Sequence, residues 1–231
     1  MPMEEQHIVT AFDRDLQQIE SQLMEMGGLV ELAIKQSVDA LRKQDTKLAE
    51  TVVKRDKKID ALDETLNEHC ARIIALRQPA ASDLRLVLSV MRITHNLERI
   101  GDYAKNIAKR TIHLSKIDHV NGTNTMIAKM AGEVHLMLTD VLDAYVRQDV
   151  DLAEQVRQRD LDVDQLYNAF FRELLTFMME DPRIITACMH LHFVAKNIER
   201  MGDHITAIAE QITYMISGDV PTDKRPTASN I

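Results

Sequence analysis

The sequence contains no tryptophan, and only 7 glycines, 5 prolines and 4% aromatic residues among its 231 positions. Glycine and proline interrupt helices, whereas aromatic side chains favour strands, so this composition disfavours a β-rich or loop-rich fold. The remaining residues are largely leucine, alanine, methionine and charged types that suit helices. A hydrophobic fraction of 45% is ample for a packed core. The composition therefore predicts an all-α protein.

Positive charge is also scarce, because 28 lysines and arginines face 36 aspartates and glutamates, for a net charge of -8. This balance disfavours binding to a nucleic-acid backbone, which requires a basic face. No uninterrupted apolar run reaches the ~20 residues that span a bilayer, and the acidic start "MPMEEQHIVTAFDRD" does not resemble a secretion signal. Cys70 and Cys188 lack any CxxC context, which favours buried thiols in a reducing compartment. We expect a soluble, cytoplasmic protein with no nucleic-acid partner and no direct membrane insertion.

The chain repeats itself. A shift of 104 residues, from Met26 to Met130, superimposes "QD" at 44–45 on "QD" at 148–149 and "LAE" at 48–50 on "LAE" at 152–154. A shift of 101 residues then superimposes "NLERIGD" at 96–102 on "NIERMGD" at 197–203. Self-similarity at a fixed spacing indicates a duplicated structural unit.

Each unit shows three segments with apolar residues at helical spacing. In the first unit the second helix is expected at about 46–77 and the third at about 83–116, with a break near Asp45. Pro79 ends the second helix and Ser82 caps the third. In the second unit Asp181 is the expected N-cap, followed by Pro182 at the first helical position.

The sequence thus predicts two tandem antiparallel three-helix bundles related by an internal repeat. The first bundle covers residues 1–120 and the second covers 121–218, with the boundary near the loop-like "DHVNGTN" at 118–124. A polar tail at 219–231 contains two prolines and is expected to fray.

Within the repeated motif, "ERIGD" at 98–102 and "ERMGD" at 199–203 each place two carboxylates four residues apart on one helical face. Like charges at this spacing repel. Each motif also holds a mid-helix glycine, Gly101 or Gly202, which costs roughly 1 kcal/mol relative to alanine. We expect these glycines to mark close helix packing. The recurrence of both penalties requires an explanation.

An opposing pair of carboxylates on the neighbouring helix offers an explanation for this recurrence. Counted from the turn at 1.5 Å per residue, the DxxxD pairs at 56–60 and 160–164 lie level with the ExxxD pairs on the next helix. Oxygen-only ligands suit Mg²⁺, Mn²⁺, Ca²⁺ or iron. The predicted metal ligands are Asp56, Asp60, Glu98, Asp102, Asp160, Asp164, Glu199 and Asp203.

Other interpretations stay open. The acids can form a solvated face with salt bridges such as Asp102 to Lys105, on a metal-free helical scaffold. A metal-handling or hydrolytic role would need a nearby base, which the sequence does not offer. A ferritin-like site needs inward ExxH motifs, and the only ExxH is Glu4 to His7. No GxSxG, P-loop or GxGxxG motif occurs, so we expect a non-enzyme.

The segment "ARIIALRQPAASDLRLVLSVMRITHNLERIGDYAKNIAKR" at 71–110 resembles the most recognisable part of the PhoU family. The resemblance covers essentially the whole chain. It implies a cytoplasmic homodimer that negatively regulates phosphate uptake and the phosphate-starvation response. Such a protein bridges the ATPase subunit of a phosphate ABC transporter and a membrane-bound sensor histidine kinase.

Some members of that family bind clustered metal ions through E(D)xxxD motifs. The resemblance therefore implies Mg, Mn, Fe or Zn at the two acidic clusters. One departure lies one turn further on, where the first unit has Asn106 and the second has Ala207. If Asn106 assists binding, the second site is weaker or differently shaped.

Overall fold

The computed structural model of the chain describes residues 2–117, 120 and 122–219. The described residues form helices joined by short turns and contain no strand: α1 (Pro2–Lys43), α2 (Thr46–Arg77), α3 (Ala81–Leu114), α4 (Thr123–Arg147), α5 (Val150–Glu180), a short 3₁₀ helix η1 (Pro182–Ile184) and α6 (Ile185–Ser217). No helix among these residues is long and apolar enough to cross a membrane. The all-α prediction is confirmed. The predicted tail lies, apart from Asp219, outside the described residues, as does Asn121.

The repeated "QD" ends one helix and starts the next in each unit. Gln44 and Gln148 adopt left-handed backbone conformations with φ of 52° and 53°, which stop α1 and α4. The following aspartates are N-caps: Asp45 accepts a hydrogen bond from the Leu48 amide at 3.0 Å, and Asp149 accepts one from the Leu152 amide at 2.9 Å. These caps satisfy otherwise unpaired amides of α2 and α5.

The turns into the third helices differ between the units. Asp181 accepts a hydrogen bond from the Arg183 amide at 3.0 Å and Pro182 opens η1, as the sequence predicted. The capping role predicted for Ser82 is wrong. Ala80 is the N-cap, in an extended conformation without a side-chain cap. Because α3 begins at Ala81, Ser82 already lies inside the first helical turn.

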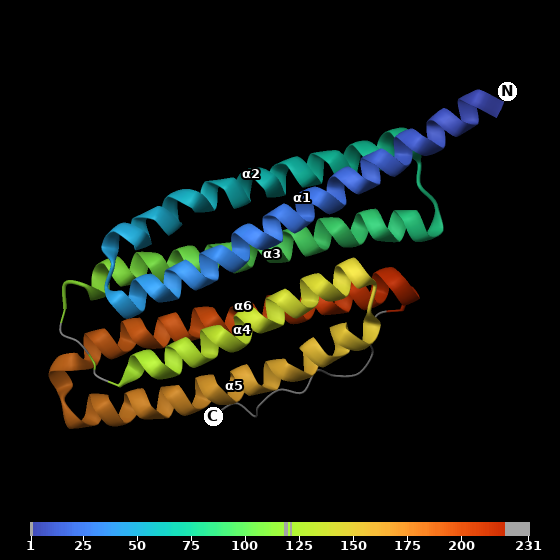
Figure 1. The fold of residues 1–231 in the computed structure, drawn as a ribbon. Helices are drawn as coiled ribbons and strands as arrows, with labels where there is room; N and C mark the ends of the chain where they lie inside the picture. Colours follow the sequence, from blue (N-terminus) through green and yellow to red (C-terminus); the bar gives the residue numbers. More distant parts are fainter. Residues whose placement is uncertain (1, 118–119, 121, 220–231) are drawn as a thin grey trace.

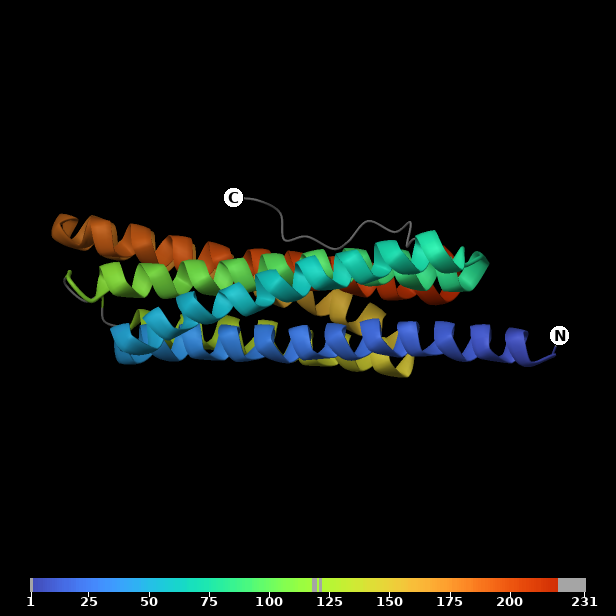
Figure 2. The same cartoon turned by 90° about the horizontal axis from the view of Figure 1, so that it is seen from above.

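The helices form two three-helix bundles, α1–α3 and α4–α6, that pack side by side (Figures 1 and 2). The main contact between the bundles joins α3 to α6, and a second joins α1 to α4. One continuous hydrophobic cluster extends through both bundles, including Leu23 and Ile93 in the first and Phe170 and Ile198 in the second. Cys70 and Cys188 are buried and free, as expected.

Repeat-equivalent residues meet where α3 crosses α6. Tyr103 and His204 occupy equivalent positions, and their Oη and Nε2 atoms lie 3.4 Å apart. Arg92 bonds to Gln211 near one end of the contact. At the other end, the guanidinium of Arg110 lies over the ring of Phe193, and these two residues are the repeat equivalents of Gln211 and Arg92. The two helices are therefore antiparallel and related by a pseudo-two-fold axis, like subunits in an isologous dimer.

Candidate functional site

A lysine joins two of the four carboxylates of the first unit. The first cluster comprises Asp56 and Asp60 on α2 and Glu98 and Asp102 on α3. Lys105 Nζ lies 2.5 Å from Asp102 Oδ1 and also contacts Asp56 Oδ2. The helical rise therefore predicted the level of Asp56 and Asp102 correctly. The salt bridge from Asp102 to Lys105, given above as the alternative to a metal, is present.

Burial and Lys105 shift the pKa values of Asp56 and Asp102 in opposite directions. Asp56 is 5% exposed, and burial raises the pKa of its carboxyl despite the hydrogen bond from Lys105. Burial also works against the charge of Asp102, but the hydrogen bond and charge of Lys105 lower the pKa of that carboxyl. The two carboxylates in turn raise the pKa of Lys105. The result is a partly buried ion triad with a fixed ammonium.

Glu98 titrates differently from its neighbour. Burial, reinforced by the charge of Asp102, raises the pKa of Glu98 to about 7. Asp63 on α2, which the sequence analysis did not select, adds to this effect. Arg99 opposes it and forms an exposed ion pair with Asp102 at 3.4 Å. A metal ion would have to displace the proton that about half of the Glu98 side chains carry at neutral pH.

The second cluster, comprising Asp160 and Asp164 on α5 and Glu199 and Asp203 on α6, is more deeply buried. Asp160 has no exposed surface, and Asp164 is also buried. Lys196 lies 2.6 Å from Glu199 Oε1, while Glu199 Oε2 is buried and accepts no hydrogen bond within the described part of the chain. Burial raises the pKa of Glu199, and the charges of Asp203 and Asp164 add to the rise.

The two clusters differ at one repeat-equivalent position. The position of Lys105 in the first unit is held by Thr206 in the second. Thr206 bonds to the Gly202 carbonyl at 2.9 Å and brings no charge. The cations near the second cluster come from other positions: Lys196 pairs with Glu199, and the buried Arg157 pairs with Glu154 at 2.5 Å and Glu210 at 3.5 Å. This difference is larger in charge than the one expected from Asn106 and Ala207.

The helix glycines let the second helix of each unit approach closely. A Cβ atom at Gly101 would lie 3.0 Å from Ile59 Cδ1 and 3.7 Å from Asp56 Oδ1. A Cβ atom at Gly202 would collide with Asp160 Oδ1. The expectation that these glycines mark close packing is therefore confirmed. Gly202 makes room for Asp160 of the opposing DxxxD pair, whereas Gly101 makes room for the side chain of Ile59.

The donor chemistry of both clusters suits a hard cation, because every side chain offers only carboxylate oxygens. Within the described ranges, however, no three histidine, cysteine, aspartate or glutamate side chains converge closely enough to hold a metal ion. In the first cluster the Lys105 ammonium occupies the space between Asp56 and Asp102. The metal-ligand assignment stays a prediction.

Sequence reasoning missed the residues that supply countercharge in the second unit. Lys196 lies three residues before Glu199, a spacing that brings helical side chains together, so it could have been found. Arg157 gave no such signal for its burial. It precedes Asp160 on α5, and its ion pair with Glu210 of α6 depends on the packing of these two helices.

Two three-helix units that share one core about a pseudo-two-fold axis, each with buried carboxylates beneath a helix glycine, define a duplicated helical-bundle protein. The family model described as "PhoU domain" matches residues 23–111 and again 127–212. The chain belongs to the PhoU family.

Relatives match along nearly the whole chain. The "phosphate-specific transport system accessory protein PhoU homolog" of Caulobacter vibrioides is 43% identical over 221 residues, which cover 96% of each protein. The crystal structure of PhoU from Pseudomonas aeruginosa superimposes with a TM-score of 0.87 at 40% identity, covering 90% of this chain and 100% of that one. The "phosphate transport system regulatory protein PhoU" of Streptococcus pneumoniae gives 0.84 at 29% identity, covering 91% and 99%.

Proposed function

We propose that this protein is a negative regulator of phosphate uptake and of the phosphate-starvation response. The observation that carries the proposal is the match to a relative named as a phosphate-specific transport system accessory protein, at 43% identity over 96% of both chains. The streptococcal neighbour, whose fold this chain shares throughout, is named a regulatory protein of phosphate transport. The same names support a non-enzymatic role.

The proposed mode of action is that of a cytoplasmic adaptor. The protein, as a homodimer, contacts the ATPase subunit of a phosphate ABC transporter and a membrane-bound sensor histidine kinase. When phosphate is abundant, it restrains the transporter and holds the kinase in its repressing state. The fold supports such a role because its long helices present extended surfaces, and the two units differ in sequence.

Deleting the gene tests the regulatory role. In phosphate-rich medium we expect the deletion strain to produce phosphatase as if starved, because the repressing signal no longer reaches the kinase. Alkaline phosphatase activity is measured in the parent, the deletion strain and the deletion strain carrying the gene on a plasmid. Phosphatase that stays repressed in the deletion strain would contradict the proposal.

A metal role is proposed for the second cluster in preference to the first. Lys105 already pairs with Asp56 and Asp102, whereas its counterpart Thr206 is uncharged. The buried Glu199 Oε2 offers an additional oxygen ligand. When bound, a divalent cation or iron would neutralise the carboxylates and stabilise the contact between α5 and α6. The alternative, metal handling or hydrolysis by these carboxylates, lacks a catalytic base.

Metal content per chain, measured by mass spectrometry after loading with manganese, iron or zinc and dialysis, tests this role. We expect stoichiometric metal that is lost in the variant Glu199→Gln/Asp203→Asn. A control variant, Asp151→Asn/Asp162→Asn, removes two exposed carboxylates of the neighbouring helix and should retain the metal. Native protein without metal after every loading would leave the metal-free scaffold as the correct interpretation.

A further inference from the structure

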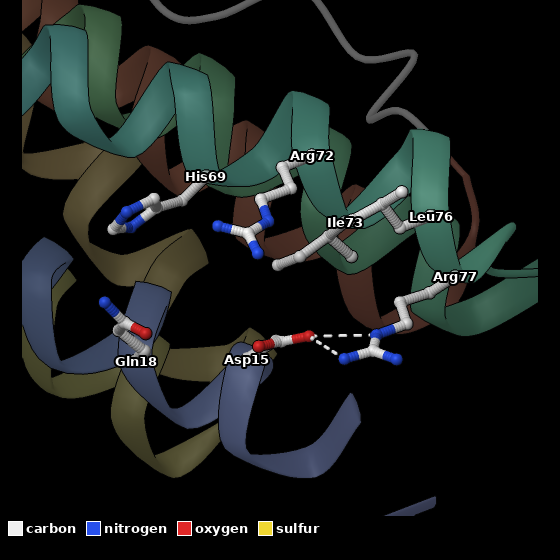
Figure 3. A pocket seen from close by; sticks show the side chains of 7 residues that line it. All are labelled: Asp15, Gln18, His69, Arg72, Ile73, Leu76 and Arg77. Atoms are coloured by element: carbon white, nitrogen blue, oxygen red, sulfur yellow. Dashed lines mark hydrogen bonds and ion pairs between the residues drawn. The ribbon is translucent and has the colours of Figure 1, made fainter. Parts of the chain in front are cut away.

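A second polar site lies on the part of α2 that follows the first carboxylate cluster and on the facing part of α1. A cavity of about 320 Å³ opens between the first part of α1 and the last turns of α2 (Figure 3). This volume falls at the lower end of the range for small-molecule sites. The lining side chains are Asp15, Gln18, His69, Arg72, Ile73, Leu76 and Arg77.

The cavity is basic in a chain that is acidic overall. Arg72 and Arg77 bring two permanent positive charges, and Asp15 brings one negative charge. Arg77 is held by Asp15, with Nε and Nη2 at 3.0 and 2.9 Å from Oδ2. Arg72 points into the cavity and forms no ion pair with any residue that the structure describes (Figure 3). Its guanidinium therefore presents donors that no carboxylate uses.

Neutral polar groups surround this guanidinium. His69 Nδ1 lies 2.9 Å from Gln22 Oε1, and because a carbonyl oxygen only accepts, Nδ1 carries the proton. Nε2 of this neutral tautomer is an acceptor, so it can take a hydrogen bond from the P–OH group of a protonated phosphate. Gln18 adds an amide on the α1 side (Figure 3). Arginine, histidine and amide groups around a small cavity form a set that suits a tetrahedral oxyanion.

The three-helix fold does not require these residues. The shift that relates the units places Glu173 at the position of His69 and Thr176 at that of Arg72. α4 begins at Thr123, the counterpart of Ile19, so Asp15 and Gln18 lie on a part of α1 that the second unit lacks. Both walls of the cavity are thus features of the first unit alone. The second unit builds the same bundle with acidic and neutral residues there.

We propose that this cavity binds a phosphoryl oxyanion, either inorganic phosphate or the phosphate group of a small phosphomonoester. Arg72 is the main ligand, because arginine matches phosphate oxygens with two parallel donors. Arg77, oriented by Asp15, supplies the second charge. The choice of inorganic phosphate as first probe rests on the proposed function, whereas the anion site rests on the cavity alone.

Calorimetric titration of the full chain with inorganic phosphate and, separately, with glycerol phosphate tests the proposal. We expect saturable binding of at least one compound, weakened about tenfold or more by Arg72→Thr, because a charge-assisted hydrogen bond is lost. Arg172→Thr, which removes an exposed arginine of α5, should leave the affinity unchanged. Asp15→Asn should strengthen binding several-fold, because it removes the competing carboxylate.

The two compounds distinguish the source of the phosphoryl group. Tighter binding of phosphate identifies the free anion, and tighter binding of glycerol phosphate identifies an ester. No saturable binding of either compound, or equal loss in the Arg72 and Arg172 variants, would overturn the proposal. Failure of the anion-binding proposal can be distinguished from failure of the regulatory proposal. Phosphatase repression is measured in cells, whereas anion binding is measured on the purified chain.

Discussion

Gly202→Ala should lower the free energy of unfolding by up to about 2 kcal/mol, although alanine is the better helix former. The new Cβ would collide with Asp160 Oδ1, an atom of a fully buried side chain on α5. Moving that carboxylate forces α5 away from α6 or places the charge in an apolar environment. Overpacking of this kind costs about 1–3 kcal/mol, which exceeds the roughly 1 kcal/mol gained from helix propensity. Thermal unfolding followed by circular dichroism measures the change.

Two other helix glycines provide matched controls for this exchange. Gly28 has nothing within 4 Å of its added Cβ, so Gly28→Ala should stabilise the protein by up to about 1 kcal/mol. Gly101→Ala meets the flexible end of Ile59 at 3.0 Å and should fall between the two. A Gly202 variant as stable as the Gly28 variant would show that the Asp160 carboxylate can move at no cost.

Much of the fold could be predicted from local sequence signals. The repeated "QD" predicted the break at Asp45, and in both units it pairs a left-handed glutamine with a capping aspartate. The choice between Ala80 and Ser82 as cap could not be made from the sequence, because it depends on where the chain leaves the turn after Pro79. Capping preference is a local free energy of about 1 kcal/mol, which the packing of a whole helix overrides.

The packing of one bundle on the other was not predicted. Each unit taken alone explains its apolar stripes, but α3 and α6 also bury small residues such as Gly101, Ala108, Gly202 and Ala209. Gly101 and Gly202 face α2 and α5 of their own units, and Ala108 packs with Ala40 and Ala49 of the first unit. These small residues therefore gave no signal for the contact between the bundles. The pseudo-two-fold axis follows only from the contact between equivalent residues such as Tyr103 and His204.

The sequence predicted which carboxylates of the candidate site lie at the same height along the bundle, but it did not predict their protonation or their ion-pair partners. The rise of 1.5 Å per residue correctly placed Asp56 level with Asp102. It could not show that Lys105 turns inward between them, because a lysine three residues from an aspartate is equally compatible with an exposed pair. The burial that raises the pKa of Glu98 to about 7 also depends on the neighbouring helix. Local spacing therefore identified the carboxylates, and tertiary packing decides their protonation and partners.

Lys105→Met should lower the free energy of unfolding by about 2–3 kcal/mol, measured by urea denaturation. Removing one partner of a buried ion pair costs about 3–5 kcal/mol; Lys105 is 21% exposed, which reduces the penalty. The loss arises because Asp56, almost fully buried, keeps its charge without an ammonium. Arg99→Met removes the other cation facing Asp102, but that pair is exposed and should contribute less than about 1 kcal/mol.

A double-mutant cycle then separates the ion pair from the packing of the lysine chain. Asp56→Asn/Lys105→Met removes both charges, so it should recover much of the stability that Lys105→Met loses, with a coupling of about 1–3 kcal/mol. Equal losses in the single Lys105 and Arg99 variants would contradict the buried triad. The second unit already folds with Thr206 at this position, beside a more deeply buried aspartate. A large coupling at Lys105 would therefore mean that the two clusters stabilise equivalent carboxylates in different ways. The first cluster uses a fixed lysine, and the second uses the groups around Glu199.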